Sequence, residues 1–235
     1  MNEVTVKQNT QLTTETNEIF GADTIDNSDL TLPRLLIMQK MSKLLEDETV
    51  TATPGDLVNS LTKEKMELPV GIIPIFSQKF WRENTMEGNE VKNSTKFPFT
   101  GENSKLPYEQ AEGNFVIKRS TVIDWYCLLA SEVSTGMALP CVVSFTKTSM
   151  PAGRKLNTLV KQAALLRKPA CGNVYSLSLQ KQSNDKGTFW VFDIAKIRES
   201  TPEEVDAAKL WYLTLQSSKV QVVEASKEEA DSVPY

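Results

Sequence analysis

Cationic and aromatic side chains lie close together along several stretches that the sequence predicts to be strands. Residues 79–82 read Lys-Phe-Trp-Arg, and Lys181 is followed across a turn by Trp190. Single-stranded nucleic acid is bound by this pairing of residue types, because cations contact the phosphates while flat rings stack on unpaired bases. The candidate residues for binding single-stranded DNA are Lys79, Trp81, Arg82, Lys118, Arg119, Trp125, Lys147, Arg154, Lys155, Lys181, Lys186 and Trp190.

Each aromatic ring in this set could instead belong to the hydrophobic core. The apolar residues after Trp125 favour a core position for that ring, whereas Trp190 could lie on either face of its strand. Trp81 stands at a strand end among charged residues, which predicts an exposed ring there and a buried one at Phe80. The cations of residues 151–168 could equally form the solvent-facing side of an amphipathic helix.

The sequence gives little support to an enzymatic function. It contains no histidine, which removes the commonest general base and the commonest metal ligand. Cys127, Cys141 and Cys171 lie within or beside apolar stretches and are expected to be buried thiols. No Walker-type or GxGxxG phosphate loop is present. We therefore expect no catalytic residue, no metal and no cofactor. A nuclease is the alternative, and it would need several convergent carboxylates.

Charge is distributed unevenly along the chain. Residues 140–198 contain ten basic and two acidic residues, a net charge of +8, within a protein of net charge −4. A basic block of this density indicates a polyanionic partner, and the acidic ends of the chain could compete with that partner. A virion-associated or structural protein whose basic block docks an acidic protein is the second alternative. No apolar run is long enough to span a bilayer, so we expect a cytoplasmic protein without membrane contact.

Periodicity and turn residues predict the order of the elements. The expected strands span residues 68–81, 114–130 (with a possible break around Arg119-Ser120), 139–148, 174–182 and 188–197, and the expected helices span 151–167 and 201–219. Ser149 is the candidate N-cap of the first helix, and Thr201 with Glu204 forms a capping box for the second. Residues 30–45 are expected as a short extended entry followed by an apolar-periodic segment, residues 57–69 as a short hairpin or connection, and residues 83–113 as a long polar loop.

Three strands, a helix and a two-stranded hairpin follow one another in the order of an OB-fold. We therefore expect a mainly β (α+β) protein built on a five-stranded OB-fold barrel. A helix would lie between strands 3 and 4, with an N-terminal extension and a C-terminal helix added. The expected divisions are a flexible arm (1–28), the nucleic-acid-binding domain (29–220) and an acidic C-terminal tail (221–235).

Several segments resemble the OB-fold single-stranded DNA-binding proteins of tailed bacteriophages. They are LPRLLIMQKMSK, PGDLVNS, LPVGIIPIFSQKFW, the Arg-Lys-Leu-Asn helix and LSLQKQSNDKGTFWVFDI, within residues 30–210. The resemblance implies a non-catalytic protein that protects single-stranded DNA during phage replication, recombination or repair in the host cytoplasm. It also implies that the tail, through Asp231, Pro234 and Tyr235, recruits replication or recombination proteins and competes with DNA. Whether the protein is a monomer or a homodimer stays open.

Overall fold

A computed structural model of the chain describes residues 30–47, 50–88, 90–136, 138–185, 187–217 and 221–222. The expected arm (1–28) and Lys186 lie outside these ranges, as does the tail apart from residues 221–222. Asp231, Pro234 and Tyr235 therefore also lie outside the described residues.

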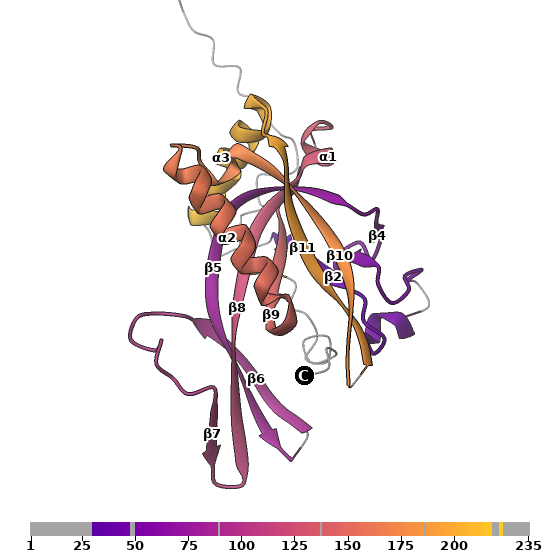
Figure 1. Cartoon of the computed structure of the whole chain (residues 1–235), viewed down its shortest axis with the longest axis vertical. Helices are drawn as coiled ribbons and strands as arrows, with labels where there is room; N and C mark the ends of the chain where they lie inside the picture. Colours follow the sequence, from indigo (N-terminus) through magenta and orange to yellow (C-terminus); the bar gives the residue numbers. More distant parts are fainter. Residues whose placement is uncertain are drawn as a thin grey trace, which may run out of the picture.

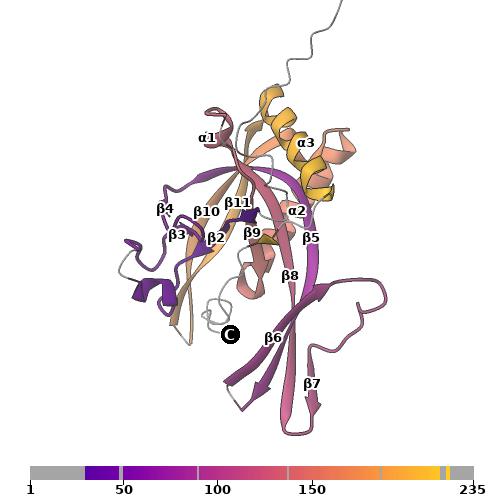
Figure 2. The same ribbon diagram turned by 180° about the vertical axis from the view of Figure 1, so that it is seen from behind.

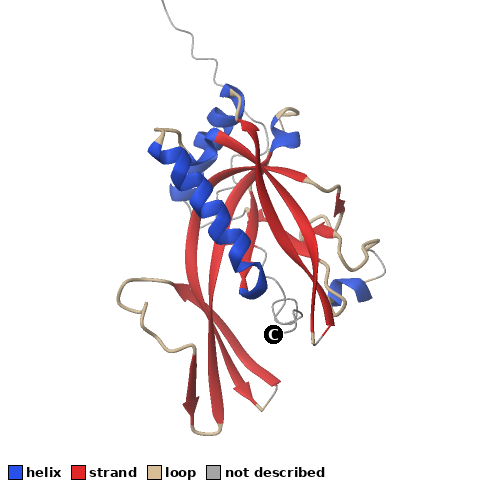
Figure 3. Cartoon of the chain, viewed as in Figure 1, coloured by secondary structure: helices blue, strands red, loops and turns tan. Residues whose placement is uncertain are grey.

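The described part of the chain is mainly β, as expected, and most of its strands form one large mixed sheet (Figures 1 and 3). The ten strands of this sheet are β2 (Arg34–Ile37), β3 (Leu57–Asn59), β4 (Lys65–Met66), β5 (Val70–Glu87), β6 (Glu90–Pro98), β7 (Glu109–Glu112), β8 (Phe115–Leu129), β9 (Cys141–Thr146), β10 (Asn173–Asn184) and β11 (Gly187–Glu199). Their order is β11-β10-β5-β8-β9-β2-β3-β4, with β6 paired to β5 and β7 paired to β8. A separate parallel pair joins β1 (Thr31–Leu32) to β12 (Gln221–Val222).

Helical segments connect and cover these strands. The α-helices are α1 (Ala130–Val133), α2 (Met150–Leu165) and α3 (Pro202–Ser217). The short 3-10 helices are η1 (Lys43–Glu46), η2 (Lys147–Ser149) and η3 (Ala170–Gly172). Figures 1 and 2 show α2 and α3 on opposite sides of the curved sheet.

Five strands follow one another along the chain in the predicted order, with α2 between the third and the fourth. β5, β8 and β9 form an antiparallel meander, β10 lies beside the start of β5, and β11 pairs with β10. The hairpin of β10 and β11 and the short hairpin of β3 and β4 are confirmed. A closed five-stranded barrel is not confirmed, because β9 pairs in parallel with β2 and the sheet stays open.

A side chain, rather than a strand pairing, bridges part of the gap between β2 and β11. The Gln39 Nε2 atom donates to the Trp190 carbonyl at 2.8 Å, and the Gln39 Oε1 atom accepts from the Trp190 N–H at 3.1 Å. The Trp190 ring lies against Gly55, where a Cβ atom would sit 2.6 Å from the indole Nε1. The positive φ of 99° at Gly55 also favours glycine there.

Alternation along the strands divides the buried residues into two clusters. Ile123, Trp125 and Cys127 on β8 face one side and pack under α2, while Leu128 faces the other side, where α3 packs. Close approach of α2 depends on Gly153, because a Cβ atom at that position would lie 2.6 Å from the Phe145 Cβ atom. The sheet is therefore covered by a helix on each face over its central part.

The region expected as a long polar loop is mostly strand. Residues 83–113 contain the end of β5, all of β6 and all of β7. Together with the first half of β8 (115–122), these strands form what we call the projecting arm, which extends beyond the helices (Figure 1). No residue of β6 or β7 is fully buried. A strand without a buried face needs no apolar alternation, so the periodicity that identifies a half-buried strand is missing.

Two smaller expectations are wrong, and the expected N-cap of α2 is confirmed in position only. Pro33 is followed directly by strand β2, so the extended entry continues to Ile37, and the apolar-periodic segment that follows contains only the 3-10 helix η1. β8 runs through Arg119-Ser120 without a break. Ser149 occupies the N-cap of α2, but its side chain makes no capping hydrogen bond.

The capping box of α3 is confirmed. The Thr201 N–H donates to Glu204 Oε2 at 2.8 Å, and the Glu204 N–H donates to Thr201 Oγ1 at 3.3 Å. The two terminal guanidinium nitrogens of Arg198, Nη1 and Nη2, each donate to one oxygen of the same carboxylate at 2.7 Å. This charge-assisted hydrogen bonding holds the pKa of Glu204 below its usual value.

Candidate nucleic-acid interface

Two adjoining hollows form a groove between the projecting arm and the start of α2. Their volumes are about 250 and 320 Å³, and they share Tyr108, Arg119, Ser120 and Lys147 in their walls. The first also contains Lys118, and the second also contains Arg154. Four of the predicted cations, Lys118, Arg119, Lys147 and Arg154, are thus brought together in what we call the basic groove.

Three elements supply these cations. Lys118 and Arg119 lie on the part of β8 that belongs to the arm, Lys147 begins η2, and Arg154 lies in the first turns of α2. Lys118 and Arg154 are exposed, and Lys147 is half-buried. Glu109 also lines the groove, so the groove contains one acidic residue beside its four cations. The start of a helix adds a partial positive charge to a wall that already carries cations.

Arg119 holds the arm together and is only partly available to a ligand. Its Nε atom lies 2.7 Å from a Glu83 carboxylate oxygen, and its Nη1 atom donates at 3.1 Å to the Pro107 carbonyl and to the Gln110 side chain. The side chain is only 7% exposed. The Arg119 N–H also donates to the carbonyl of Tyr108 at 2.6 Å. Arg119 therefore fixes the segment that carries Tyr108.

The structure contradicts the expectation that Trp81 is an exposed ring. Trp81 is 1% exposed and packs between Phe99, at a centroid distance of 5.2 Å, and Tyr108, at 5.5 Å. Its indole N–H donates to the Asn103 carbonyl at 3.1 Å. The segment of residues 99–108 folds back over the sheet and covers Trp81. The charged neighbours of Trp81 in the sequence give no sign of this covering.

Tyr108 is the exposed ring of the groove, and it is not among the residues predicted from the sequence. It is 65% exposed and lines both hollows. Its signal in the sequence is an aromatic residue after a proline within a polar stretch, at Leu-Pro-Tyr-Glu. This local pattern does not predict that residues 99–108 fold back and place Tyr108 beside the cations of β8 and α2.

The other predicted residues lie apart from the groove or are engaged elsewhere. Trp125 is 4% exposed and donates to Asn157 Oδ1 at 2.8 Å, so it is a core residue and cannot stack on a base. Lys79 lies 3.5 Å above the centre of the Phe99 ring. Lys155 pairs with Asp193 at 3.0 Å. Arg82 is half-buried and pairs in register with Ser120 of β8.

Lys181 and Trp190 form a separate cation–aromatic pair on the hairpin of β10 and β11. The Lys181 Nζ atom lies 5.9 Å from the centre of the Trp190 ring. Trp190 is half-buried because one side of the ring lies against Gly55. This pair is predicted correctly as a neighbouring cation and ring, but it does not line the basic groove.

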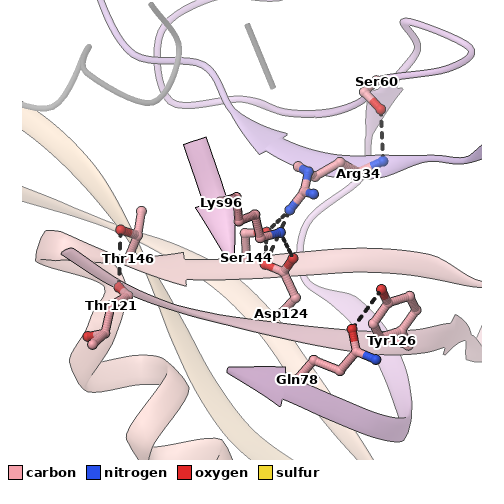
Figure 4. Close-up of polar contacts among 9 residues, drawn as sticks. All are labelled: Arg34, Ser60, Gln78, Lys96, Thr121, Asp124, Tyr126, Ser144 and Thr146. Atoms are coloured by element: carbon pink, nitrogen blue, oxygen red, sulfur yellow. Dashed lines mark hydrogen bonds and ion pairs between the residues drawn. The ribbon is translucent and has the colours of Figure 1, made fainter. Parts of the chain in front are cut away.

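A buried charge network lies elsewhere on the sheet (Figure 4). Asp124, whose side chain is 1% exposed, accepts from Arg34 at 3.3 Å and from Lys96, and Ser144 also contacts this carboxylate. Burial alone would raise the pKa of Asp124, but the two cations and the hydrogen bonds hold it below its usual value. Burial lowers the pKa of Lys96 despite its contact with Asp124. The network links side chains of β2, β6, β8 and β9, and we therefore assign it a role in stability rather than in binding.

The described residues show no donor set for a metal. No group of three or more cysteine, aspartate or glutamate side chains in this part of the chain is arranged to hold one. Cys127, Cys141 and Cys171 are free and buried, as expected, and burial raises the pKa of the Cys141 thiol to about 12. Within the described residues, no helix combines the length and the apolar character that crossing a membrane requires.

Fold and site together define a mainly β protein with an open mixed sheet and a basic groove beside an exposed tyrosine. The chain belongs to the Pam3 phage gp34-like protein family, whose model matches residues 3–221. Comparison with curated proteins and with solved structures gives no match. The name of the family connects the chain to bacteriophages.

Proposed function

We propose that this protein binds single-stranded DNA largely without sequence preference and protects it during phage DNA replication, recombination or repair. The observation that carries the proposal is the convergence of Lys118, Lys147 and Arg154 on one groove beside Tyr108. Cations spaced along a groove suit the repeating phosphates of a nucleic acid. An exposed ring beside them suits stacking on an unpaired base.

The geometry of Tyr108 favours a single strand over a duplex. The backbone on both sides of the ring is fixed, because Arg119 donates to the carbonyls of Pro107 and Tyr108. A ring held in place loses little conformational freedom when a base stacks on it. Bases inside a duplex already stack on one another, so only an unpaired base offers a free face.

We infer that the body is an opened form of the OB-fold. Support comes from the pairing of β5, β8, β9, β10 and β11, which follows the Greek-key order, and from the position of α2 between β9 and β10. In this account β2 occupies the edge of β9 that a closing strand would take. The acidic tail recruits replication or recombination partners, in the host cytoplasm.

Charge reversal in the groove tests the proposal. We expect Lys147→Glu and Arg154→Glu each to weaken binding of an oligo-dT strand at least about tenfold and to flatten the salt dependence of the affinity. Lys209→Glu on α3, an exposed lysine outside the groove, is the control and should change little. Loss of a labelled strand during incubation with divalent metal would instead indicate a nuclease. Absence of strand binding by the unaltered protein would favour a protein-docking function for the basic block.

A further inference from the structure

A third hollow, separate from the two of the basic groove, lies between the later turns of α2 and the hairpin of β10 and β11. Its volume is about 170 Å³, close to the ~150 Å³ of an apolar cavity that binds one benzene ring. One wall is apolar and comes from Leu159 and Ala163 of α2 and from Leu166, the residue that follows the helix. The space therefore suits a single planar ring.

The opposite wall is polar. Asn173 and Tyr175 of β10, which are 2% and 1% exposed, line the hollow. The Asn173 Nδ2 atom makes a long contact of 3.5 Å to the Tyr175 hydroxyl, and its Oδ1 atom has no hydrogen-bond partner among the described residues. A buried amide oxygen without a donor is unfavourable. A ligand N–H that reaches this oxygen from the hollow would remove that cost.

Cations stand at the mouth of the hollow. Lys168 pairs with Glu199, and Lys196 lies in register with Tyr175 on the neighbouring strand. Two lysines against one glutamate leave an excess positive charge that suits an anionic group outside the ring. Gln162, an exposed residue on the same rim, adds a second amide.

We propose that this hollow, which we call the α2–β10 pocket, binds one nucleotide. A nucleobase supplies a planar ring with an N–H edge for Asn173, and its phosphate supplies the anion for the lysines at the mouth. Amide side chains are well suited to the donor and acceptor pattern of a base edge. The inference rests on the proposed function for its choice of a nucleotide over other anionic rings.

The position of the pocket makes it an extension of the basic groove. Arg154, in the groove wall, and Gln162, on the pocket rim, are eight residues apart on α2, about 12 Å along the helix axis. An extended single strand that leaves the groove along α2 would reach the pocket after very few nucleotides. The pocket then accepts one base of the bound strand, and the phosphates on either side of it lie near Arg154 and Lys196.

Mononucleotides are the direct probe. Binding of dTMP, dCMP, dAMP and dGMP to the full chain would be followed by saturation-transfer NMR, with Gln162→Trp as the variant that fills the pocket mouth from an exposed position. Lys161→Trp, on the adjacent exposed residue that does not line the pocket, is the matched control. We expect Gln162→Trp and Lys196→Glu to weaken mononucleotide binding at least about tenfold. Lys161→Trp should stay within about twofold of the unaltered protein.

The outcomes separate this inference from the proposed function. If oligo-dT binds through the groove but no mononucleotide gives a signal that Gln162→Trp removes, the pocket assignment is overturned and the strand-binding proposal stands. If a peptide with the sequence DSVPY binds the pocket and mononucleotides do not, the pocket is a peptide site. If oligo-dT does not bind at all, the proposed function itself fails, whatever the mononucleotides do.

Discussion

Tyr108 stands edge-on to the buried indole of Trp81, with ring centroids 5.5 Å apart and an interplanar angle of 68°. The two residues come from different segments and differ in exposure, at 65% and 1%. Trp81 is a fixed support, and Tyr108 is the ring that it presents beside the cations of the groove. The exposed ring beside the cations is therefore Tyr108, and not Trp81 as the sequence predicts.

Replacing Tyr108 by alanine should weaken binding without unfolding the protein. We expect Tyr108→Ala to reduce the affinity for oligo-dT by ~1–3 kcal/mol, the usual contribution of one base–aromatic stack. The melting temperature should change little because the ring is mostly exposed. Tyr212→Ala on α3, 44% exposed and remote from the groove walls, is the control for loss of a surface tyrosine. Equal affinity of Tyr108→Ala and the unaltered protein would remove Tyr108 from the interface.

Replacing Trp81 should, in contrast, reduce the stability of the protein. Trp81→Ala removes a fully buried ring and its hydrogen bond to Asn103, so we expect the free energy of unfolding to fall by ~3–5 kcal/mol. Urea denaturation measures this change, and Trp81→Phe should recover part of the loss. A decrease below ~1 kcal/mol in Trp81→Ala would show that residues 99–108 do not cover this ring.

The central strands and helices could be predicted because their residues meet the core on one side. Leu177, Phe192 and Ile194 give the alternation of a half-buried hairpin, and Thr201 with Glu204 marks a helix start by local chemistry. The arm could not be predicted in this way. No residue of its strands β6 and β7 is fully buried, so pairing to β5 and β8 determines the structure of these two strands, and the side-chain pattern does not.

The cations of the candidate site could be predicted from the sequence, but its exposed aromatic ring, Tyr108, could not. Lys118, Lys147 and Arg154 are recognisable as surface charges from local sequence, and the fold brings them together across three elements. Trp81 and Tyr108 are separated by 27 positions, and the segment between them decides which ring is covered. That choice depends on tertiary contacts, such as those of Arg119 with Pro107 and Gln110, which leave no local signature.

Protonation of Asp124 at low pH should weaken its ion pairs with Arg34 and Lys96 and so lower the stability of the protein. The pKa of Asp124 lies below its unfolded value near 3.9, so the network stabilises the protein above that pH. The contribution is lost as the pH falls through the lower, folded-state pKa. Asp124→Asn should reduce the free energy of unfolding by ~3–5 kcal/mol at neutral pH, because Arg34 and Lys96 lose their buried counter-charge.

Urea titrations at a series of pH values test this prediction. The difference between Asp124→Asn and the unaltered protein should shrink as the pH falls below about 4. Asp206→Asn, which removes an exposed partner of Lys209, is the control and should change stability by no more than ~1 kcal/mol. A difference for Asp124→Asn that stays constant down to the lowest pH would contradict the assignment.

Removing the tail should strengthen DNA binding at low salt. Deletion of residues 224–235 takes away four acidic residues and one lysine. If the tail competes for the basic groove, the truncated protein binds oligo-dT more tightly in dilute buffer. The advantage fades as the screening length falls from ~30 Å at 0.01 M to ~8 Å at physiological salt. Pull-down of replication proteins should also be lost. If the truncation changes neither the affinity for oligo-dT at low salt nor the pull-down, the tail has no role in DNA competition or partner recruitment.

The measurement that tests the central claim most directly is the affinity of the full chain for oligo-dT and for a duplex of equal length, at the same salt concentration. Tryptophan fluorescence or polarisation of a labelled strand can follow both titrations. The account predicts tighter binding of the single strand, with the preference reduced in Tyr108→Ala, because only unpaired bases can stack on that ring. Equal affinity for the two, unchanged by Tyr108→Ala, would show a merely cationic surface and contradict the account.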